Sequence, residues 1–214
     1  MPNKKTLKCV CVKQGCWRSD IKIPEYCEAN NYIHELEVSN KEYSKKPVID
    51  AYKAACVVRA HNEGMTPRIE EALLYAKELR LKRIGFAACV SMSMELELLV
   101  KLFKKEGFEV FTTGCQIGGV DATNRGVPEV QGYSASVCHS IAQAEILNKE
   151  KTELNFILGL CMGHDILFTR FSKAPVSTLI VKDRVTGNNP AAALYGWHRR
   201  KLLFGVPLTD PDIV

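Results

Sequence analysis

Four short apolar runs alternate with helical segments, and this alternation constrains the fold more than any other feature of the sequence. The runs span residues 83–88, 108–113, 154–160 and 176–181. Each has the length and composition of a buried strand, and the intervening segments carry apolar residues at helical spacing. Strands separated by helices predict an open, mainly parallel sheet with right-handed crossovers and helices on both faces. The predicted fold class is therefore α/β.

The character of the sequence changes near residue 46. Residues 1–46 are polar, show little periodicity and hold four of the nine cysteines. From Pro47 onward the pattern is regular, with a helix predicted over 47–58 and a second helix that begins at Pro67. We predict a Cys-rich, metal-binding N-terminal segment over 1–46 and an α/β domain over 47–214.

Composition excludes several classes of protein. A hydrophobic content of 46% with 25% charged residues is typical of a globular chain. No apolar run is long enough for a membrane span, and no apolar signal region follows the basic N-terminus, so we expect a cytoplasmic protein. The net charge of +5 is mild and spread along the chain, which argues against a nucleic-acid partner. In a reducing cytosol, nine cysteines indicate metal binding or thiol chemistry rather than disulfides.

One set of cysteines lies in the N-terminal segment. Cys9, Cys11, Cys16 and Cys27 form a C-x-C-x4-C-x10-C pattern. So polar a segment offers little core in which to bury four thiols, and a shared metal would supply the folding energy that it otherwise lacks. Four thiolates suit tetrahedral zinc or an iron–sulfur cluster equally.

A second set of cysteines follows the predicted strands. Cys89, Cys115 and Cys161 come after the first three strands, and Cys138 lies at the start of a helix predicted over 139–149. Ligands of open parallel sheets gather at the carboxyl ends of the strands, where the positive ends of helices favour the thiolate. Neighbouring strands are about 4.8 Å apart, so thiols on three strand ends spread over roughly 10 Å. That spread favours a 4Fe–4S cluster over a single zinc ion; the alternative is that these thiols are buried as small apolar side chains.

Further polar residues follow the third and fourth strands. His164 is a candidate ligand or proton donor, with a partner of the helix cap as the alternative. Asp165 is expected to cap the helix that begins there or to orient His164. Lys182 and Arg184 follow the fourth strand and are candidates for an anion clamp; a solvated turn is the alternative. Ser91 is expected to cap the helix that follows the first strand.

Several segments of the chain resemble one protein family. They are Cys89-Val90, Gly159-Leu160-Cys161-Met162-Gly163-His164-Asp165, Val181-Lys182-Asp183-Arg184-Val185, Asn189-Pro190 and Ala193-Leu194-Tyr195. In these segments the chain is similar to the predicted metal-binding proteins of domain-of-unknown-function family 1847, from anaerobic bacteria and archaea. The chain departs from the family pattern at Cys9-Val10-Cys11, where the family has C-x2-C, and at Asn188, where the family has histidine. The resemblance implies metal binding and supplies no reaction.

Three hypotheses fit these residues. The first is an iron–sulfur protein with redox or sulfur-transfer chemistry, holding a 4Fe–4S cluster at one or both cysteine sets. The second is an α/β enzyme with a cysteine nucleophile, stabilised by zinc at the N-terminal set. The third is a metal carrier or electron-transfer protein without catalysis. The expected partner is a small anionic substrate, bound or protonated by His164, Lys182 and Arg184, or a redox partner protein.

Overall fold

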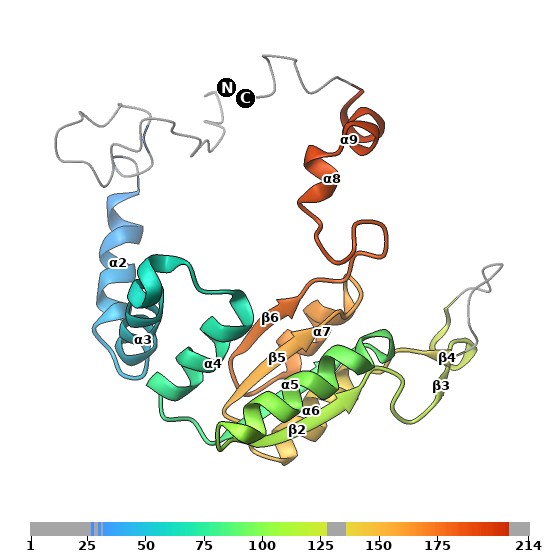
Figure 1. Cartoon of the computed structure of the whole chain (residues 1–214), viewed down its shortest axis with the longest axis horizontal. Coiled ribbons are helices and arrows are strands. Elements are labelled where there is room, and N and C mark those ends of the chain that lie inside the picture. The colour runs from blue at the N-terminus through green and yellow to red at the C-terminus, as the bar shows by residue number, and fades with distance from the viewer. Residues whose placement is uncertain (1–26, 28–29, 31, 128–135, 206–214) are drawn as a thin grey trace. The chain divides into compact units, whose positions relative to one another are not determined.

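The computed structural model describes residues 27, 30, 32–127 and 136–205, and it confirms the α/β fold class (Figure 1). The described part of the chain separates into two compact units, with the boundary between residues 61 and 62. In the first unit, α2 (Ile33–Tyr43) packs against α3 (Val48–Ala60). The sequence predicts α3 but not α2, in which no residue is buried. Cys9, Cys11 and Cys16 lie outside the described residues, so the N-terminal metal site stays a prediction.

A four-stranded parallel sheet forms the centre of the second unit. The spatial order of its strands is β2-β1-β5-β6, and every neighbouring pair is parallel. The strands are β1 (Arg83–Ala88), β2 (Glu109–Gly114), β5 (Leu154–Leu158) and β6 (Val176–Ile180). Each lies within one of the predicted apolar runs or is displaced from it by one residue. β1 and β5 occupy the middle of the sheet and are almost completely buried, as continuous apolar runs predict.

Helices connect the strands and cover the sheet. After α4 (Arg68–Glu78), the chain passes through α5 (Ser93–Lys105) from β1 to β2, α6 (Ser140–Lys149) from β2 to β5 and α7 (His164–Phe171) from β5 to β6. The chain moves from β1 toward one edge of the sheet and then back past β1 toward the other. Right-handed crossovers therefore place α5 on one face and α6 and α7 on the other, where these two helices pack together.

This winding reverses the strand order between the carboxyl ends of β1 and β5. The two strands are neighbours, but the chain leaves β1 toward β2 and leaves β5 toward β6. In open α/β sheets, ligands bind in the crevice at such a reversal of strand order. The fold therefore points to the loops that begin at Cys89 and Gly159 as the place for a functional site.

An aromatic core holds these strand ends in place. The rings of Phe86 on β1 and Phe156 on β5 are cross-strand neighbours with centroids 5.6 Å apart. Phe103 of α5 packs edge-on against Phe86 at 5.3 Å. All three side chains are fully or almost fully buried, and each contributes about 1.5–3 kcal/mol by leaving water.

The described parts of the segment between β2 and α6 contain two short strands. β3 (Val120–Asp121) and β4 (Ser136–Val137) pair as a short antiparallel ribbon. Past β6 the chain forms α8 (Ala192–Tyr195) and α9 (Trp197–Phe204), which the sequence does not predict. No described helix has the length and apolar character that crossing a membrane requires.

Candidate functional site

Cys89 and Cys161 lie in the two loops where the strand order reverses. Cys89 directly follows β1, and its backbone N–H donates to the Leu158 carbonyl at the end of β5 (2.9 Å). The chain leaves β5 through Gly159, which has a φ of +60°. A Cβ at this position would come within 2.8 Å of the Met92 Cγ, so both the turn and the close packing require glycine. The turn returns Cys161 to the edge of the sheet that carries Cys89.

Lys182 contacts both of these cysteines from the loop after β6. Its Nζ donates to the Cys89 Sγ at 2.6 Å and lies 3.8 Å from the Cys161 Sγ. The Ser91 hydroxyl also donates to the Cys89 Sγ, at 3.2 Å. Burial raises the pKa of Cys89, but the Lys182 ammonium and Ser91 together outweigh burial and lower this pKa from 9.0 to about 7. Cys89 therefore ionises near neutral pH although its side chain is only 6% exposed.

Cys115 and Cys138 form a second pair at the same edge. Cys115 directly follows β2 and is 1% exposed, whereas Cys138 is half-buried between β4 and α6. The His139 N–H donates to the Cys115 carbonyl at 2.6 Å and ties the two segments together. Burial, followed by the proximity of the other three thiols, raises the pKa of Cys138 to about 12. Cys138 therefore keeps its proton at neutral pH, where Cys89 is about half ionised.

A buried glutamine of α6 fixes the strand ends that carry two of these thiols. Gln143 is completely buried, and its Nε2 donates to the Thr113 carbonyl at 2.9 Å and to the Ala88 carbonyl at 3.3 Å. Ala88 immediately precedes Cys89, and Thr113 lies two residues before Cys115. Gln143 therefore couples the ends of β1 and β2. It acts as a positioning residue for the cysteine cluster, which consists of Cys89, Cys115, Cys138 and Cys161.

The loop after β6 has a structure of its own. The Asp183 carboxylate accepts the N–H groups of Val185 and Thr186 at 2.9 and 3.0 Å. The Asn188 side chain accepts the Asp183 N–H at 3.1 Å. Arg184 is exposed and makes no hydrogen bond or ion pair within the described part of the chain. Of the two residues predicted as an anion clamp, the structure therefore places Lys182 against the thiols.

His164 begins α7 next to the cluster. Its N–H donates to the Cys161 carbonyl at 3.0 Å, and its ring borders a cavity of about 130 Å³ that Cys138 also lines. The His164 Nδ1 is buried without a hydrogen-bond partner among the described residues. Gly163 occupies the N-cap position of α7, so Asp165 is not the cap residue that the sequence predicts. Asp165 lies in the first turn of the helix, where its carboxylate accepts the N–H groups of Gly163 and Ile166 at 3.0 and 2.8 Å.

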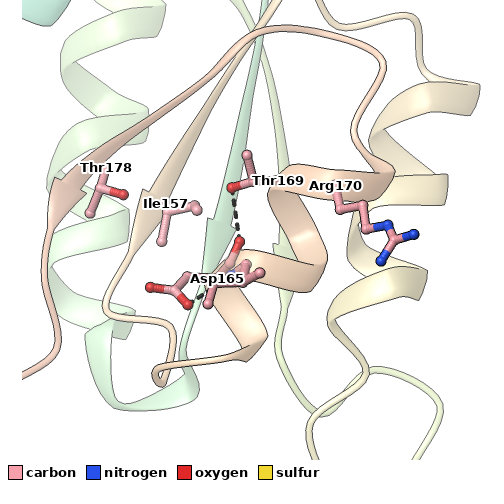
Figure 2. Close-up of a pocket in the computed structure, with 6 residues that line it drawn as sticks. Ile157, Asp165, Thr169, Arg170 and Thr178 are labelled. Atoms are coloured by element: carbon pink, nitrogen blue, oxygen red, sulfur yellow. Dashed lines mark hydrogen bonds between the residues drawn. The ribbon is translucent and has the colours of Figure 1, made fainter. Parts of the chain in front are cut away.

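A second cavity, of about 330 Å³, lies between α7 and the strands β5 and β6. Figure 2 shows Thr169 and Arg170 of α7 on its border, with the Thr169 hydroxyl donating to the Asp165 carbonyl at 2.8 Å. No cysteine or histidine lines this cavity. It is therefore separate from the thiol site.

The chemistry of the cysteine cluster suits a soft metal, but its spacing does not suit a single metal ion. Within residues 32–127 and 136–205, together with Cys27, no three cysteine, histidine or acidic side chains come close enough together to hold one. Cys138 does lie near enough to the other three strand-edge thiols, those of Cys89, Cys115 and Cys161, for them to raise its pKa. A mononuclear zinc site at this edge is therefore not supported by the arrangement of the donors.

The chain matches a known protein family over a range that includes most residues of this site. A family described as "Protein of unknown function (DUF1847)" matches residues 27–179, a range that includes all four strand-edge cysteines and His164. The chain belongs to the DUF1847 family. It is also similar to the uncharacterized protein MJ0455 of Methanocaldococcus jannaschii, with 38% identity over 167 residues that cover 77% of this chain and 86% of the relative. The family resemblance found in the sequence is confirmed, and the function of this DUF1847 protein must be argued from its site.

Sequence reasoning misses two parts of the site. Ser91 lies in the 3₁₀ helix η2 (Val90–Met92) and donates to Cys89, instead of capping the next helix as predicted. The sequence does not mark Gln143 as a site residue, because a glutamine within a helix usually faces solvent. The signal that could have drawn attention to Gln143 is its place among apolar neighbours, because Ala144 and Leu147 on the same helix are buried too.

Proposed function

We propose that this DUF1847 protein is a thiol-dependent oxidoreductase in which Cys89 attacks an oxidised sulfur substrate and Cys161 then resolves the mixed disulfide formed on Cys89. The observation that carries this proposal is the position of the Lys182 ammonium, 2.6 Å from one sulfur and 3.8 Å from the other. A cation in hydrogen-bond contact with a thiol favours the thiolate, which is the reactive form. A pKa near ambient pH is also the optimum for an attacking thiol.

The proposed reaction is the reduction of a disulfide, RS–SR. The Cys89 thiolate attacks one sulfur, forms a Cys89–SR mixed disulfide and expels RS⁻, which takes a proton from the Lys182 ammonium. The Lys182 amine then accepts the proton of the Cys161 thiol. The Cys161 thiolate attacks the Cys89 sulfur and expels the second RS⁻, which takes a proton from solvent. The substrate is reduced to two RSH molecules, the protein dithiol is oxidised to a disulfide, and an external dithiol restores the reduced protein.

The topology supports Cys161 as the resolving thiol. β1 and β5 are neighbours, about 4.8 Å apart, and both thiols follow the carboxyl ends of these strands. Both sulfur atoms contact one ammonium group, so they occupy the same side of the crevice. Cys138, with its pKa raised to about 12, is a poor competitor for this step.

A single-turnover experiment tests the proposal. Reduced protein is mixed with one equivalent of 2-hydroxyethyl disulfide, and the released 2-mercaptoethanol is counted. We expect two equivalents from the wild type, one equivalent and a stable mixed disulfide on Cys89 from Cys161→Ser, and no fast release from Cys89→Ser. Cys56→Ser, which removes an exposed cysteine of α3, is the matched control and should behave as wild type. Wild-type release from Cys89→Ser would refute the proposal.

An iron–sulfur centre at the strand-edge cysteines is the second candidate. The observation that favours it is that Cys138 lies near enough to Cys89, Cys115 and Cys161 for these thiols to raise its pKa, although no three described donors could hold a single ion. A four-iron cluster is larger than one ion and carries cysteine ligands at its corners. The test is the iron and sulfide content of anaerobically purified wild type and of a Cys89→Ala, Cys161→Ala double variant. A loss of iron in the variant would favour the cluster, and unchanged iron would exclude it from this edge.

A further inference from the structure

The cavity next to the thiol site plays no part in the disulfide exchange proposed above. It has a volume of about 130 Å³ and is lined by four aliphatic side chains and by Arg125, Cys138, Ser140 and His164. Cavities for drug-sized ligands measure roughly 300–1,000 Å³. The cavity is therefore large enough only for a small compound or for one end of a longer one.

The polar side chains around this cavity include a cation and no carboxylate. Arg125 ends the 3₁₀ helix η3 (Thr123–Arg125) and has no carboxylate partner within the described part of the chain. The Asp121 carboxylate, four residues earlier, is occupied by the N–H and hydroxyl of Thr123 at 2.8 and 2.6 Å. His164 presents its buried Nδ1 without a described partner. Counting only partners in the described part of the chain, the lining therefore contains an unpaired cation and a ring nitrogen without a hydrogen bond, and it includes no acidic side chain.

The N-terminus of α6 adds a further positive contribution. Ser140 and Ile141, the first two residues of this ten-residue helix, both line the cavity. The first turn of α6 has no acidic residue and no side-chain cap. The free N–H groups of a helix N-terminus carry partial positive charge and favour an anion nearby.

We propose that this cavity binds the anionic end of the substrate, which is a small sulfur compound with a carboxylate or sulfonate group. The inference rests on the proposed function and deepens it by naming the class of substrate. Arg125 and the α6 N-terminus bind the anion, and the aliphatic side chains pack against a short carbon chain. Cys138 borders the cavity and lies within electrostatic range of Cys89, so the sulfur end of a bound substrate is directed toward the cysteine cluster.

The experiment compares two ligands that differ in charge. Reduced, ¹⁵N-labelled protein is titrated with 3-mercaptopropionate and, separately, with its neutral analogue 3-mercaptopropan-1-ol, and backbone amide shifts are followed. We expect saturable shifts at Val137, Ser140 and Ile141 with the anion, and about tenfold weaker binding of the alcohol, as the loss of one charged hydrogen bond implies. Equal binding of the two ligands, or shifts away from this cavity, would overturn the inference.

Two arginine variants provide the matched comparison. Arg125→Gln should weaken 3-mercaptopropionate about tenfold, by loss of the same charged contact. Arg170→Gln removes an arginine that lines the other cavity (Figure 2) and should bind as the wild type does. Unchanged binding by Arg125→Gln, or equal weakening by both variants, would contradict the inference.

A bound thiol undergoes no disulfide exchange in this binding assay, so the result of the assay is independent of the reactivity of Cys89. Anion binding together with an unreactive Cys89 would refute only the proposed function, and absent binding together with a reactive Cys89 would refute only this inference.

Discussion

Replacing Lys182 with methionine should remove the main stabilisation of the Cys89 thiolate while keeping an apolar side chain of similar length. The Cys89 pKa of about 7 lies below the ordinary 9.0 because Lys182 and Ser91 outweigh burial. This lowering corresponds to about 2–3 kcal/mol in favour of the thiolate. In Lys182→Met, burial is opposed by Ser91 alone, so we expect the pKa to return to 9 or above.

The expected change in reactivity follows from the change in pKa. At pH 7 a thiol with a pKa of 7 is about half ionised and one with a pKa of 9 about 1% ionised, so the thiolate population falls about 50-fold. The more basic thiolate is intrinsically about tenfold more nucleophilic, because nucleophilicity rises with a Brønsted coefficient near 0.5. Alkylation of Cys89 should therefore slow by about fivefold at pH 7 and become faster than in the wild type at pH 10.

The assay is the rate of iodoacetamide labelling of the Cys89 peptide between pH 5 and 11, followed by mass spectrometry. The midpoint of the wild-type profile should lie near pH 7, and that of Lys182→Met at or above pH 9. Lys104→Met, a change at an exposed position of α5, is the control and should leave the profile unchanged. If the midpoint for Lys182→Met stays near pH 7, the ion pair does not activate Cys89.

Two predictions concern stability. Gln143→Leu leaves two buried strand-end carbonyls without their hydrogen-bond donor, so it should lower the free energy of unfolding by about 2–4 kcal/mol. Urea titrations measure this change, and an unchanged unfolding midpoint would contradict the prediction. The native pKa of Cys89 lies below its unfolded value, so its stabilising contribution is complete above pH 9 and is lost as pH falls through about 7. Wild-type unfolding free energy should therefore gain from pH 7 to 9 a contribution that is missing in Lys182→Met, and equal pH dependence of the two proteins would contradict it.

The strands could be predicted from the sequence because burial on both faces leaves a clear pattern. β1 and β5 are short, continuous apolar runs, and parallel strands in the middle of a sheet require such runs. The order β2-β1-β5-β6 could not be predicted, because no local residue pattern says which strands become neighbours. α2 escaped prediction because its large apolar residues are irregularly spaced, at Ile33, Leu36, Val38 and Tyr43, and form no clear helical stripe.

Chain topology predicts which cysteines share one edge of the sheet, but it does not predict the side-chain contacts that they make there. Cysteines that follow parallel strands must lie at one edge of the sheet, and the structure places Cys89 and Cys161 there. The lowered pKa of Cys89 depends on contacts from Lys182 and Ser91. The Lys182 contact joins residues 93 positions apart in the chain, and it depends on the path of the loop after β6. Sequence spacing carries no information on such a contact.

The most direct test of the proposed thiol chemistry is to identify the disulfide that forms when the reduced protein is oxidised by one equivalent of a small disulfide. The products are separated by acid quenching, proteolysis without reductant and mass spectrometry. We expect a disulfide that links Cys89 to Cys161, while Cys115 and Cys138 remain thiols. A disulfide between Cys115 and Cys138, with Cys89 and Cys161 still reduced, would contradict the proposed roles of Cys89, Cys161 and Lys182.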